Sequence, residues 1–311
     1  MVSDASTPPP RRELPLPPWL RVRPPSGENF ERVKRRAADG VLHTVCREAR
    51  CPNVADCWAA GTATFMVLGD TCTRGCRFCS VESARLPPPP DPREPRRLAE
   101  TLGTMRLTHA VVTTVCRDDL PDQGAGHIAA CVRAIRDRAP KLRLEVLIQD
   151  FRGDPAPLKT VVAAAPDILA HNLETVERLT RLVRDARAGY RQSLEALRSI
   201  RRMDPRIPTK SSLLLGLGET VEEIAQAMRD LREAGVEFLT LGQYLRPTAA
   251  PRHLPVAQYV RPERFEELGG RARAMGFCHV VSGPLVRSSY RAGDLPLGRH
   301  RAGNASGGGN V

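Results

Sequence analysis

TFMVLGDTCTRGCRFC, residues 64–79, joins a short apolar run to three cysteines at positions 72, 76 and 79. The apolar run predicts a buried β-strand, and the C-x3-C-x2-C spacing after it places three thiols on one loop. Three thiolates can hold three irons of a cubane [4Fe–4S] cluster, which leaves the fourth iron free to bind a substrate or cofactor. A structural zinc site would normally need a fourth protein ligand, so zinc is the weaker alternative.

Outward from this stretch, strand-like and helix-like segments alternate along the chain. The β-branched runs lie at 64–68, 110–115, 142–148, 168–170, 211–217, 238–241 and 279–281. The helical patterns lie at 95–104, 125–138, 176–183, 193–202, 220–234 and 262–275. This alternation predicts an α/β fold, a partial or complete TIM-like (β/α) barrel with a parallel sheet. In such barrels the chemistry lies at the carboxyl ends of the strands.

A second group of cysteines precedes the first, at positions 46, 51 and 57 in C-x4-C-x5-C spacing. Together the two groups account for six of the nine cysteines in the chain. An odd total, in a chain without an apolar leader, argues against a disulfide scaffold and for metal or redox chemistry. For the second group alone, a structural metal site or a redox pair is the alternative.

LHTVCREARCPNVADCWAAGTATFMVLGDTCTRGCRFC, residues 42–79, closely resembles the lipoyl synthases, a family of the radical S-adenosylmethionine superfamily. The resemblance covers residues 18–293 and runs through six further segments. They are VCRDDLPDQGAGH (115–127), EVLIQDFRG (145–153), LAHNLETV (169–176), TKSSLLLGLGET (209–220), LTLGQYLRPT (239–248) and SGPLVRSSYRAG (282–293).

The resemblance implies two [4Fe–4S] clusters, each held by one of the cysteine groups. Cys72, Cys76 and Cys79 would bind the cluster that activates S-adenosylmethionine. Cys46, Cys51 and Cys57 would bind an auxiliary cluster. Its fourth iron would be held by a serine of Arg287-Ser288-Ser289-Tyr290, with Ser289 expected and Ser288 the fallback. The alternative is that this RSSY motif only makes hydrogen bonds on a loop.

Six residues at strand ends are expected to contact S-adenosylmethionine. Thr113 and Thr114 end the second strand, where this superfamily commonly contacts the methionine part. Asn172 and Glu174 follow the fourth strand and are candidates for the ribose hydroxyls. Gly216 and Glu219 close the fifth strand, where glycine permits close approach of the backbone to a cofactor. A plain strand-to-helix turn explains that glycine equally well.

The reaction that the resemblance implies is insertion of two sulfur atoms, at C6 and C8 of an octanoyl chain on a lysine of a carrier protein. The expected partners are an acidic octanoylated lipoyl-carrier domain, an electron donor such as flavodoxin or ferredoxin, and an iron–sulfur cluster carrier. Neither a membrane nor a nucleic acid is expected. Two alternatives stay open: another radical S-adenosylmethionine enzyme that inserts sulfur into a nucleic-acid base or vitamin precursor, and a zinc-stabilised basic binding protein without catalytic activity.

The charge is uneven along the chain. The net charge is +12, and residues 178–206 hold nine arginines against three acids. A docking surface for the acidic carrier, including Arg178, Arg181 and Arg184, is the preferred interpretation, and a solvated helix face is the alternative.

The sequence divides into five regions. They are an extended or disordered lead (1–27), an N-terminal extension with the auxiliary cysteines (28–62, with a helix at 28–41), the barrel (63–278), a C-terminal segment with RSSY (279–295) and a disordered tail (296–311). The chain has no apolar run of 18 residues, and we expect a cytoplasmic protein.

One substitution departs from the family pattern near the first cysteine loop. Lipoyl synthases commonly read VDRDDL where this chain reads VCRDDL, residues 115–120. Cys116 thus replaces an acid. Since both cysteine groups are complete without it, we do not expect Cys116 to bind a cluster.

Overall fold

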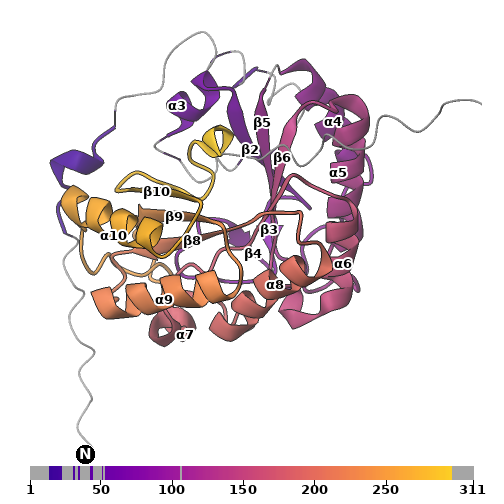
Figure 1. Ribbon diagram of the computed structural model, residues 1–311. Helices are drawn as coiled ribbons and strands as arrows, with labels where there is room; N and C mark the ends of the chain where they lie inside the picture. The colour runs from indigo at the N-terminus through magenta and orange to yellow at the C-terminus, as the bar shows by residue number, and fades with distance from the viewer. Residues whose placement is uncertain are drawn as a thin grey trace, which may run out of the picture.

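The computed structural model describes residues 14–22, 31, 34–35, 43–44, 51, 53–105 and 107–295. Its centre is one sheet that curls into an open barrel (Figure 1). In spatial order the strands are β1 (His43–Thr44), β2 (Thr62–Val67), β5 (His109–Thr114), β6 (Arg143–Leu147), β7 (Ile168–Ala170), β8 (Thr209–Leu215), β9 (Phe238–Gln243) and β10 (His279–Gly283). All are parallel to their neighbours except β1, which is antiparallel to β2. Within the described residues β10 pairs only with β9, so the barrel is partial.

Helices follow the strands and cover the outside of the sheet (Figure 1). They are α3 (Val54–Ala59), α4 (Glu94–Thr104), α5 (Ala125–Arg138), α6 (Pro155–Ala163), α7 (Thr180–Val183), α8 (Tyr190–Met203), α9 (Val221–Glu233) and α10 (Pro262–Ala274). Four 3-10 turns, η1 (Pro18–Leu20), η2 (Phe151–Gly153), η3 (Glu177–Leu179) and η4 (Ala292–Asp294), and a ribbon of β3 (Thr71–Cys72) and β4 (Glu82–Ser83) complete the described elements. Across the described part of the chain, no helix is long and apolar enough to cross a membrane.

Most residues of the parallel strands are buried, whereas β10 at the edge of the sheet is half-buried along its whole length. All six residues of β2 and all six of β9 are buried. Successive side chains point to opposite faces. Phe65 packs in the hydrophobic cluster that includes Ile128 of α5, whereas Thr64 on the other face donates a hydrogen bond to Ser289. The sheet therefore offers an apolar outside and a partly polar inside.

A buried ion pair crosses the inside of the barrel. The Nζ of Lys210 on β8 lies 2.9 Å from both carboxylate oxygens of Glu145 on β6, and each side chain is at most 2% exposed. The Nε2 of His109 on β5 lies 3.7 Å from the same carboxylate. Charges removed from water this far must be paired. The pair therefore holds β6 and β8 in one arrangement around the barrel axis.

The segment after β10 returns across the amino ends of the strands. Leu295 packs with Ile168 and Phe238, the first residues of β7 and β9. Gly293 lies so close to β2 that an added Cβ would meet the Oγ1 of Thr62 at 3.0 Å. This return closes the amino end of the barrel and places the RSSY motif beside β2.

The structure confirms the predicted α/β fold with a partial barrel, and each of the seven parallel strands begins and ends within two residues of its predicted bounds. Helix α6 was not predicted, because prolines at 155 and 157 mask it; Asp154 caps it by accepting from the Ala156 N–H, and proline suits the first helical turn. Strand β10 extends the barrel sheet to Gly283, beyond the boundary expected at residue 278. Of the helix expected at 28–41, Glu31, Lys34 and Arg35 are helical and the rest lies outside the described residues, as does the tail at 296–311.

Replacing Lys210 with methionine should lower the free energy of unfolding by about 3–5 kcal/mol, because it leaves the Glu145 carboxylate buried without its cation. Denaturant unfolding measures the loss. The double variant Lys210→Met/Glu145→Leu should regain most of it, since the unpaired charge is then removed. Arg96→Ala, which breaks the exposed pair with Glu100, is the matched control and should leave stability unchanged. A loss in Lys210→Met no larger than in this control would contradict the argument.

Candidate active site

The first cysteine loop lies at the carboxyl end of the barrel, where backbone N–H groups point at its sulfurs. The Sγ of Cys72 accepts from the N–H groups of Arg74 at 3.4 Å and Cys116 at 3.3 Å. The Sγ of Cys76 accepts from the N–H of Asp185 at 3.3 Å. Such N–H donors stabilise the thiolate form, which is the form that binds iron.

The three thiols of this loop differ in acidity. The hydrogen bond from the Cys116 thiol lowers the pKa of Cys72 to about 6. Burial raises the pKa of Cys76 to about 11 and that of Cys79 to about 12, and the charges of the neighbouring cysteines contribute to both shifts. The three sulfurs thus lie within electrostatic range of one another, and Cys76 and Cys79 need a bound cation to lose their protons at neutral pH.

This donor set fits an iron–sulfur cluster better than a single metal ion. Nowhere in the described residues do three or more His, Cys, Asp or Glu side chains gather as a single ion would require. A cubane takes one thiolate at each of three iron corners, so its ligands do not converge on one point.

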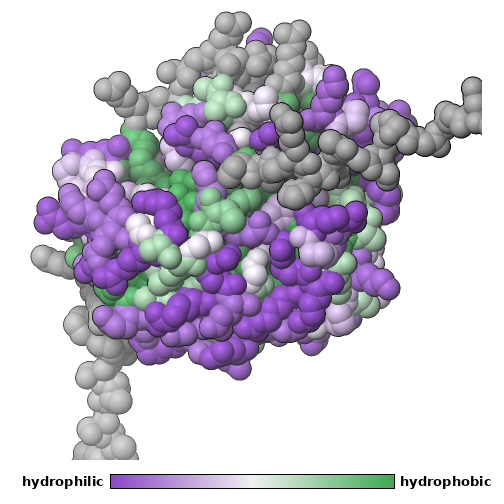
Figure 2. Space-filling view, in the orientation of Figure 1, coloured by the Kyte–Doolittle hydropathy of each residue, from purple (hydrophilic) through white to green (hydrophobic). Residues whose placement is uncertain are grey.

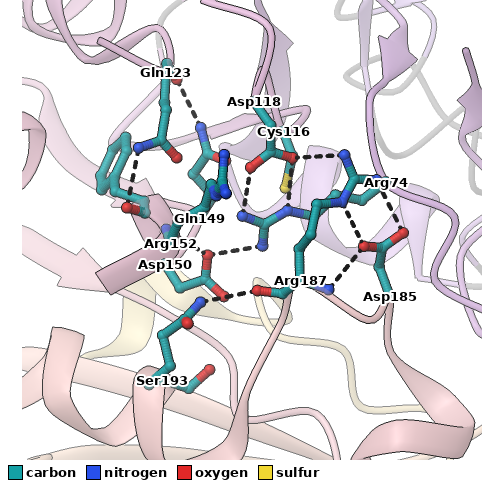
Figure 3. Close-up of polar contacts among 12 residues, drawn as sticks. Arg74, Cys116, Asp118, Gln123, Gln149, Asp150, Arg152, Asp185, Arg187 and Ser193 are labelled. Atoms are coloured by element: carbon teal, nitrogen blue, oxygen red, sulfur yellow. Dashed lines mark hydrogen bonds and ion pairs between the residues drawn. The ribbon is translucent and has the colours of Figure 1, made fainter. Parts of the chain in front are cut away.

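An arginine between the first two cysteines anchors the loop to the barrel. Arg74 donates to both carboxylate oxygens of Asp118 at 2.9 and 2.8 Å and to Asp150 at 2.7 Å, and it is 4% exposed. Figure 3 shows Asp118, Asp150 and Asp185 arranged around the guanidinium groups of Arg74 and Arg187. These ion pairs hold the pKa values of Asp118 and Asp150 below their usual range against the opposing effect of burial. Arg74 therefore ties the loop to the ends of β5 and β6.

The loop has further supports that the sequence did not reveal. The Nε2 of His253, which is buried, lies 3.0 Å from the carbonyl oxygen of Cys79, and its Nδ1 lies 2.8 Å from the Oγ1 of Thr248. Arg74, Asp118 and Asp150 lie in segments that match the family, in CTRGC, RDDL and QDFRG. Charged residues within such segments were a usable signal, whereas a single histidine in a long loop carried none.

The predicted contacts with S-adenosylmethionine lie around this loop. Thr113 and Thr114 are half-buried at the end of β5. Glu174 adopts a φ of 69°, bonds to the side chain of Asn172, and lies near enough to Cys76 and Cys79 for its charge to raise the pKa of each. Burial raises the pKa of Glu174 itself to about 7. The structure thus brings Asn172 and Glu174 together beside the cysteine loop, and their binding role stays a prediction.

Gly216 and Glu219 form a turn whose geometry is explained by the protein itself. Glu219 accepts from the N–H groups of Gly216 at 2.5 Å and Leu217 at 2.9 Å. Gly216 has a φ of 98°, and an added Cβ would meet the Nε2 of Gln243 at 2.2 Å and the carbonyl oxygen of Gln258 at 2.3 Å. These neighbours require glycine at position 216, so the strand-to-helix turn alone explains this residue. Contact of either residue with a cofactor stays a prediction.

The second cysteine group meets the RSSY motif, although the two lie at opposite ends of the chain. The Nδ2 of Asn53 donates to the carbonyl oxygen of Leu285 at 2.5 Å. The Oγ1 of Thr64 donates to the Oγ of Ser289 at 2.9 Å. Tyr290 packs against the core cluster that contains Cys57, and Arg287 lies near enough to Cys51 to lower the pKa of its thiol against burial. Cys46 lies outside the described residues.

The arginine-rich region is not the free basic surface that its charge count suggested. Figure 2 shows mainly hydrophilic residues over α8 and α9. Five of its arginines pair with acids outside the region: Arg178 with Glu223, Arg184 with Asp150, Arg187 with Asp118, Arg191 with Glu177 and Arg201 with Glu237. The expectation that Arg184 is a docking residue is wrong, because Arg184 is buried at 8% exposure and donates to Ser193 at 2.7 Å.

Replacing Arg74 with methionine should abolish iron binding at the first loop and lower the free energy of unfolding by about 3–5 kcal/mol, because it leaves Asp118 and Asp150 without their shared cation. Arg74→Lys should also lose iron, since an ammonium cannot make the forked contact. Iron analysis and denaturant unfolding measure the two effects. Arg93→Met, at an exposed pair with Asp91, is the control. The role given to Arg74 fails if its variants bind as much iron as this control.

Comparison with known proteins identifies the family. The model of the radical SAM superfamily matches residues 66–231, and the model of the N-terminal domain of lipoyl synthase matches residues 7–51. The lipoyl synthase of Anaeromyxobacter sp. (strain Fw109-5) is 56% identical over 90% of this chain and 95% of its own length. The mitochondrial lipoyl synthase of Aedes aegypti is 53% identical over 91% of this chain and 72% of its own length. The lipoyl synthase of Thermus thermophilus is 54% identical over 89% of this chain and 85% of its own length.

Among solved structures, HydG, a maturase of the [FeFe]-hydrogenase, shares the fold with a TM-score of 0.54. It is 16% identical, and the match covers 70% of this chain and 56% of that chain. With the two family models and the close relatives, the conclusion is that the chain belongs to the lipoyl synthase family of the radical SAM superfamily.

Proposed function

We propose that this enzyme inserts sulfur at C6 and C8 of an octanoyl chain held in amide linkage on a lysine of a lipoyl-carrier protein. The observation that carries the proposal is the meeting of Cys51 and Cys57 with the RSSY segment next to the barrel that holds Cys72, Cys76 and Cys79. Family membership supports radical chemistry on S-adenosylmethionine with a [4Fe–4S] cluster. It does not favour the alternative of a sulfur-inserting enzyme that acts on a nucleic-acid base or vitamin precursor.

The residues of the first loop hold and shield the activating cluster. When bound, this cluster supplies the one-electron chemistry that activates S-adenosylmethionine. Arg74 fixes the loop against Asp118 and Asp150, and the N–H groups of Arg74 and Cys116 point at the Cys72 sulfur. The half-buried pair of Asn172 and Glu174 offers polar atoms for a ribose beside this loop. Thr113 and Thr114 lie at the strand end nearest to the methionine part in the family pattern.

The second three-cysteine group, with Ser289, holds the proposed auxiliary cluster. When bound, this cluster would supply the sulfur atoms that are inserted. Thr64 donates to the Ser289 Oγ and thereby orients it. Ser289 would hold the fourth iron through its Oγ, and an alkoxide is a harder donor than a thiolate, so it would be the weaker ligand to this iron. Two adjacent groups of three thiols, each short of a fourth, support one cluster for each group.

The partners follow from the substrate. The carrier is proposed to be an acidic lipoyl domain bearing the octanoyl chain, since the enzyme is strongly basic with a net charge of +12. An electron donor such as flavodoxin or ferredoxin and an iron–sulfur cluster carrier complete the proposed set. A cytoplasmic location is also part of the proposal, although several relatives are named as mitochondrial.

The test is anaerobic turnover of an octanoyl-lysyl peptide with S-adenosylmethionine and a reductant, followed by mass spectrometry of the peptide and quantitation of 5′-deoxyadenosine. The reconstituted enzyme should give a peptide with two added sulfur atoms. Cleavage of S-adenosylmethionine without any sulfur in the peptide would overturn the proposed reaction and leave the radical chemistry intact.

Ser289→Ala should reduce sulfur insertion by at least about tenfold and retain cleavage of S-adenosylmethionine, because only the auxiliary site loses a ligand. Ser288→Ala is the matched control from the neighbouring position and should behave like the unchanged enzyme. If Ser288→Ala loses sulfur insertion and Ser289→Ala does not, the ligand assignment within RSSY is reversed. If both variants insert sulfur as well as the unchanged enzyme, neither serine is a ligand of the auxiliary cluster.

A further inference from the structure

Cys116 is a thiol next to the first cysteine loop that the proposed reaction does not use. It lies two residues after the end of β5, and both its carbonyl oxygen and its N–H are hydrogen-bonded to the cysteine loop. Its carbonyl oxygen accepts from the N–H of Thr73 at 2.9 Å and from the Thr73 Oγ1 at 3.0 Å. Its own N–H donates to the Sγ of Cys72 at 3.3 Å. The two backbones are therefore held beside each other.

The two side chains also meet. The thiol of Cys116 is hydrogen-bonded to the sulfur of Cys72. Both cysteines are half-buried, so a small oxidant can reach them. Among the described cysteines, Cys116 is the one whose thiol is hydrogen-bonded to Cys72. The sulfur of Cys76 instead accepts a hydrogen bond from the backbone N–H of Asp185. Two thiols in contact on firmly held backbones have the proximity that disulfide formation requires.

A second set of contacts holds the segments of Cys72 and Cys116 next to each other. Asp118, two residues after Cys116, accepts hydrogen bonds from the Nε and Nη2 of Arg74, and its N–H donates to the Oγ1 of Thr73 at 3.1 Å. The segments 72–74 and 116–118 thus form one unit with little freedom to separate. All the contacts that make up this unit are made between residues of the chain.

We propose that, in the chain without its cluster, Cys72 and Cys116 form a reversible disulfide that withholds Cys72 from iron. The proposal rests on the assignment of Cys72 as a cluster ligand. With hydrogen peroxide as the oxidant, each thiol gives up one proton and one electron, an S–S bond forms, and the O–O bond is cleaved to give two water molecules. A dithiol reductant reverses the step by exchange and returns both thiols.

The disulfide would protect the cluster-free enzyme as well as silence it. A thiolate left free beside peroxide proceeds to sulfinic and sulfonic acids, which are not reduced back, whereas a disulfide is recovered. The acid that the family commonly carries at position 116 cannot form such a bond. The proposal therefore depends on the cysteine that this chain carries in VCRDDL, residues 115–120.

The test uses the full chain freed of iron, treated anaerobically with one equivalent of hydrogen peroxide, alkylated and digested without reductant. Mass spectrometry should find the Cys72 peptide joined to the Cys116 peptide. Reconstitution with iron and sulfide in the absence of dithiol should then recover about half of the iron of the untreated chain, because one of two clusters cannot form. Dithiothreitol should restore the full amount.

Three variants decide the outcome. Cys116→Ala and Cys116→Asp should take up full iron after peroxide without any dithiol, whereas Cys278→Ser, at an exposed cysteine away from the loop, should behave like the unchanged chain. A crosslink from Cys72 to Cys76 or Cys79, or equal iron loss in Cys116→Ala and the unchanged chain, would overturn the proposal. If the crosslink forms but the reduced chain takes up no iron at this loop, the disulfide stands and the proposed cluster fails.

Discussion

The buried fork of Arg74 on Asp118 and Asp150 is the interaction on which the proposed active site depends. A guanidinium that is 4% exposed must have its charge and its donors satisfied, and each of the two carboxylates comes from the loop after a different strand. Removing any one of these three charged side chains would leave a buried charge without its partner. The cysteine loop is therefore held to β5 and β6 by the same contacts that make Arg74 tolerable inside the protein.

Further contacts hold the barrel together from the cysteine loop to its amino end. Below the loop, the Lys210–Glu145 pair holds β6 and β8 from the inside. At the amino end, Leu295 closes the barrel on Ile168 and Phe238. That return of the chain brings Ser289 to Thr64 and the RSSY segment to the second cysteine group. The fold thereby joins residues more than 200 positions apart in the sequence beside one open barrel.

The sequence predicted the strands well because each is a short β-branched run between loops, and it predicted that Cys72, Cys76 and Cys79 share one loop because their spacing is local. It missed α6, whose prolines at 155 and 157 resemble a loop until Asp154 is seen to cap the helix. It misjudged Arg184, because counting charges along the chain does not show which arginines fold inward or meet acids such as Glu223 and Glu237. Pairing, burial and the neighbours of Gly216 are tertiary facts, and only the folded chain displays them.

The central claim is that one chain holds two separate clusters on two separate groups of three cysteines. The most direct measurement is iron and acid-labile sulfide per chain after anaerobic reconstitution, on the unchanged protein and on Cys46→Ala/Cys51→Ala/Cys57→Ala. The unchanged protein should hold about eight irons and the triple variant about four, and the cluster that remains in the variant should still cleave S-adenosylmethionine. About four irons in both proteins would contradict the claim, since the second group would then bind no cluster and sulfur insertion would have no source.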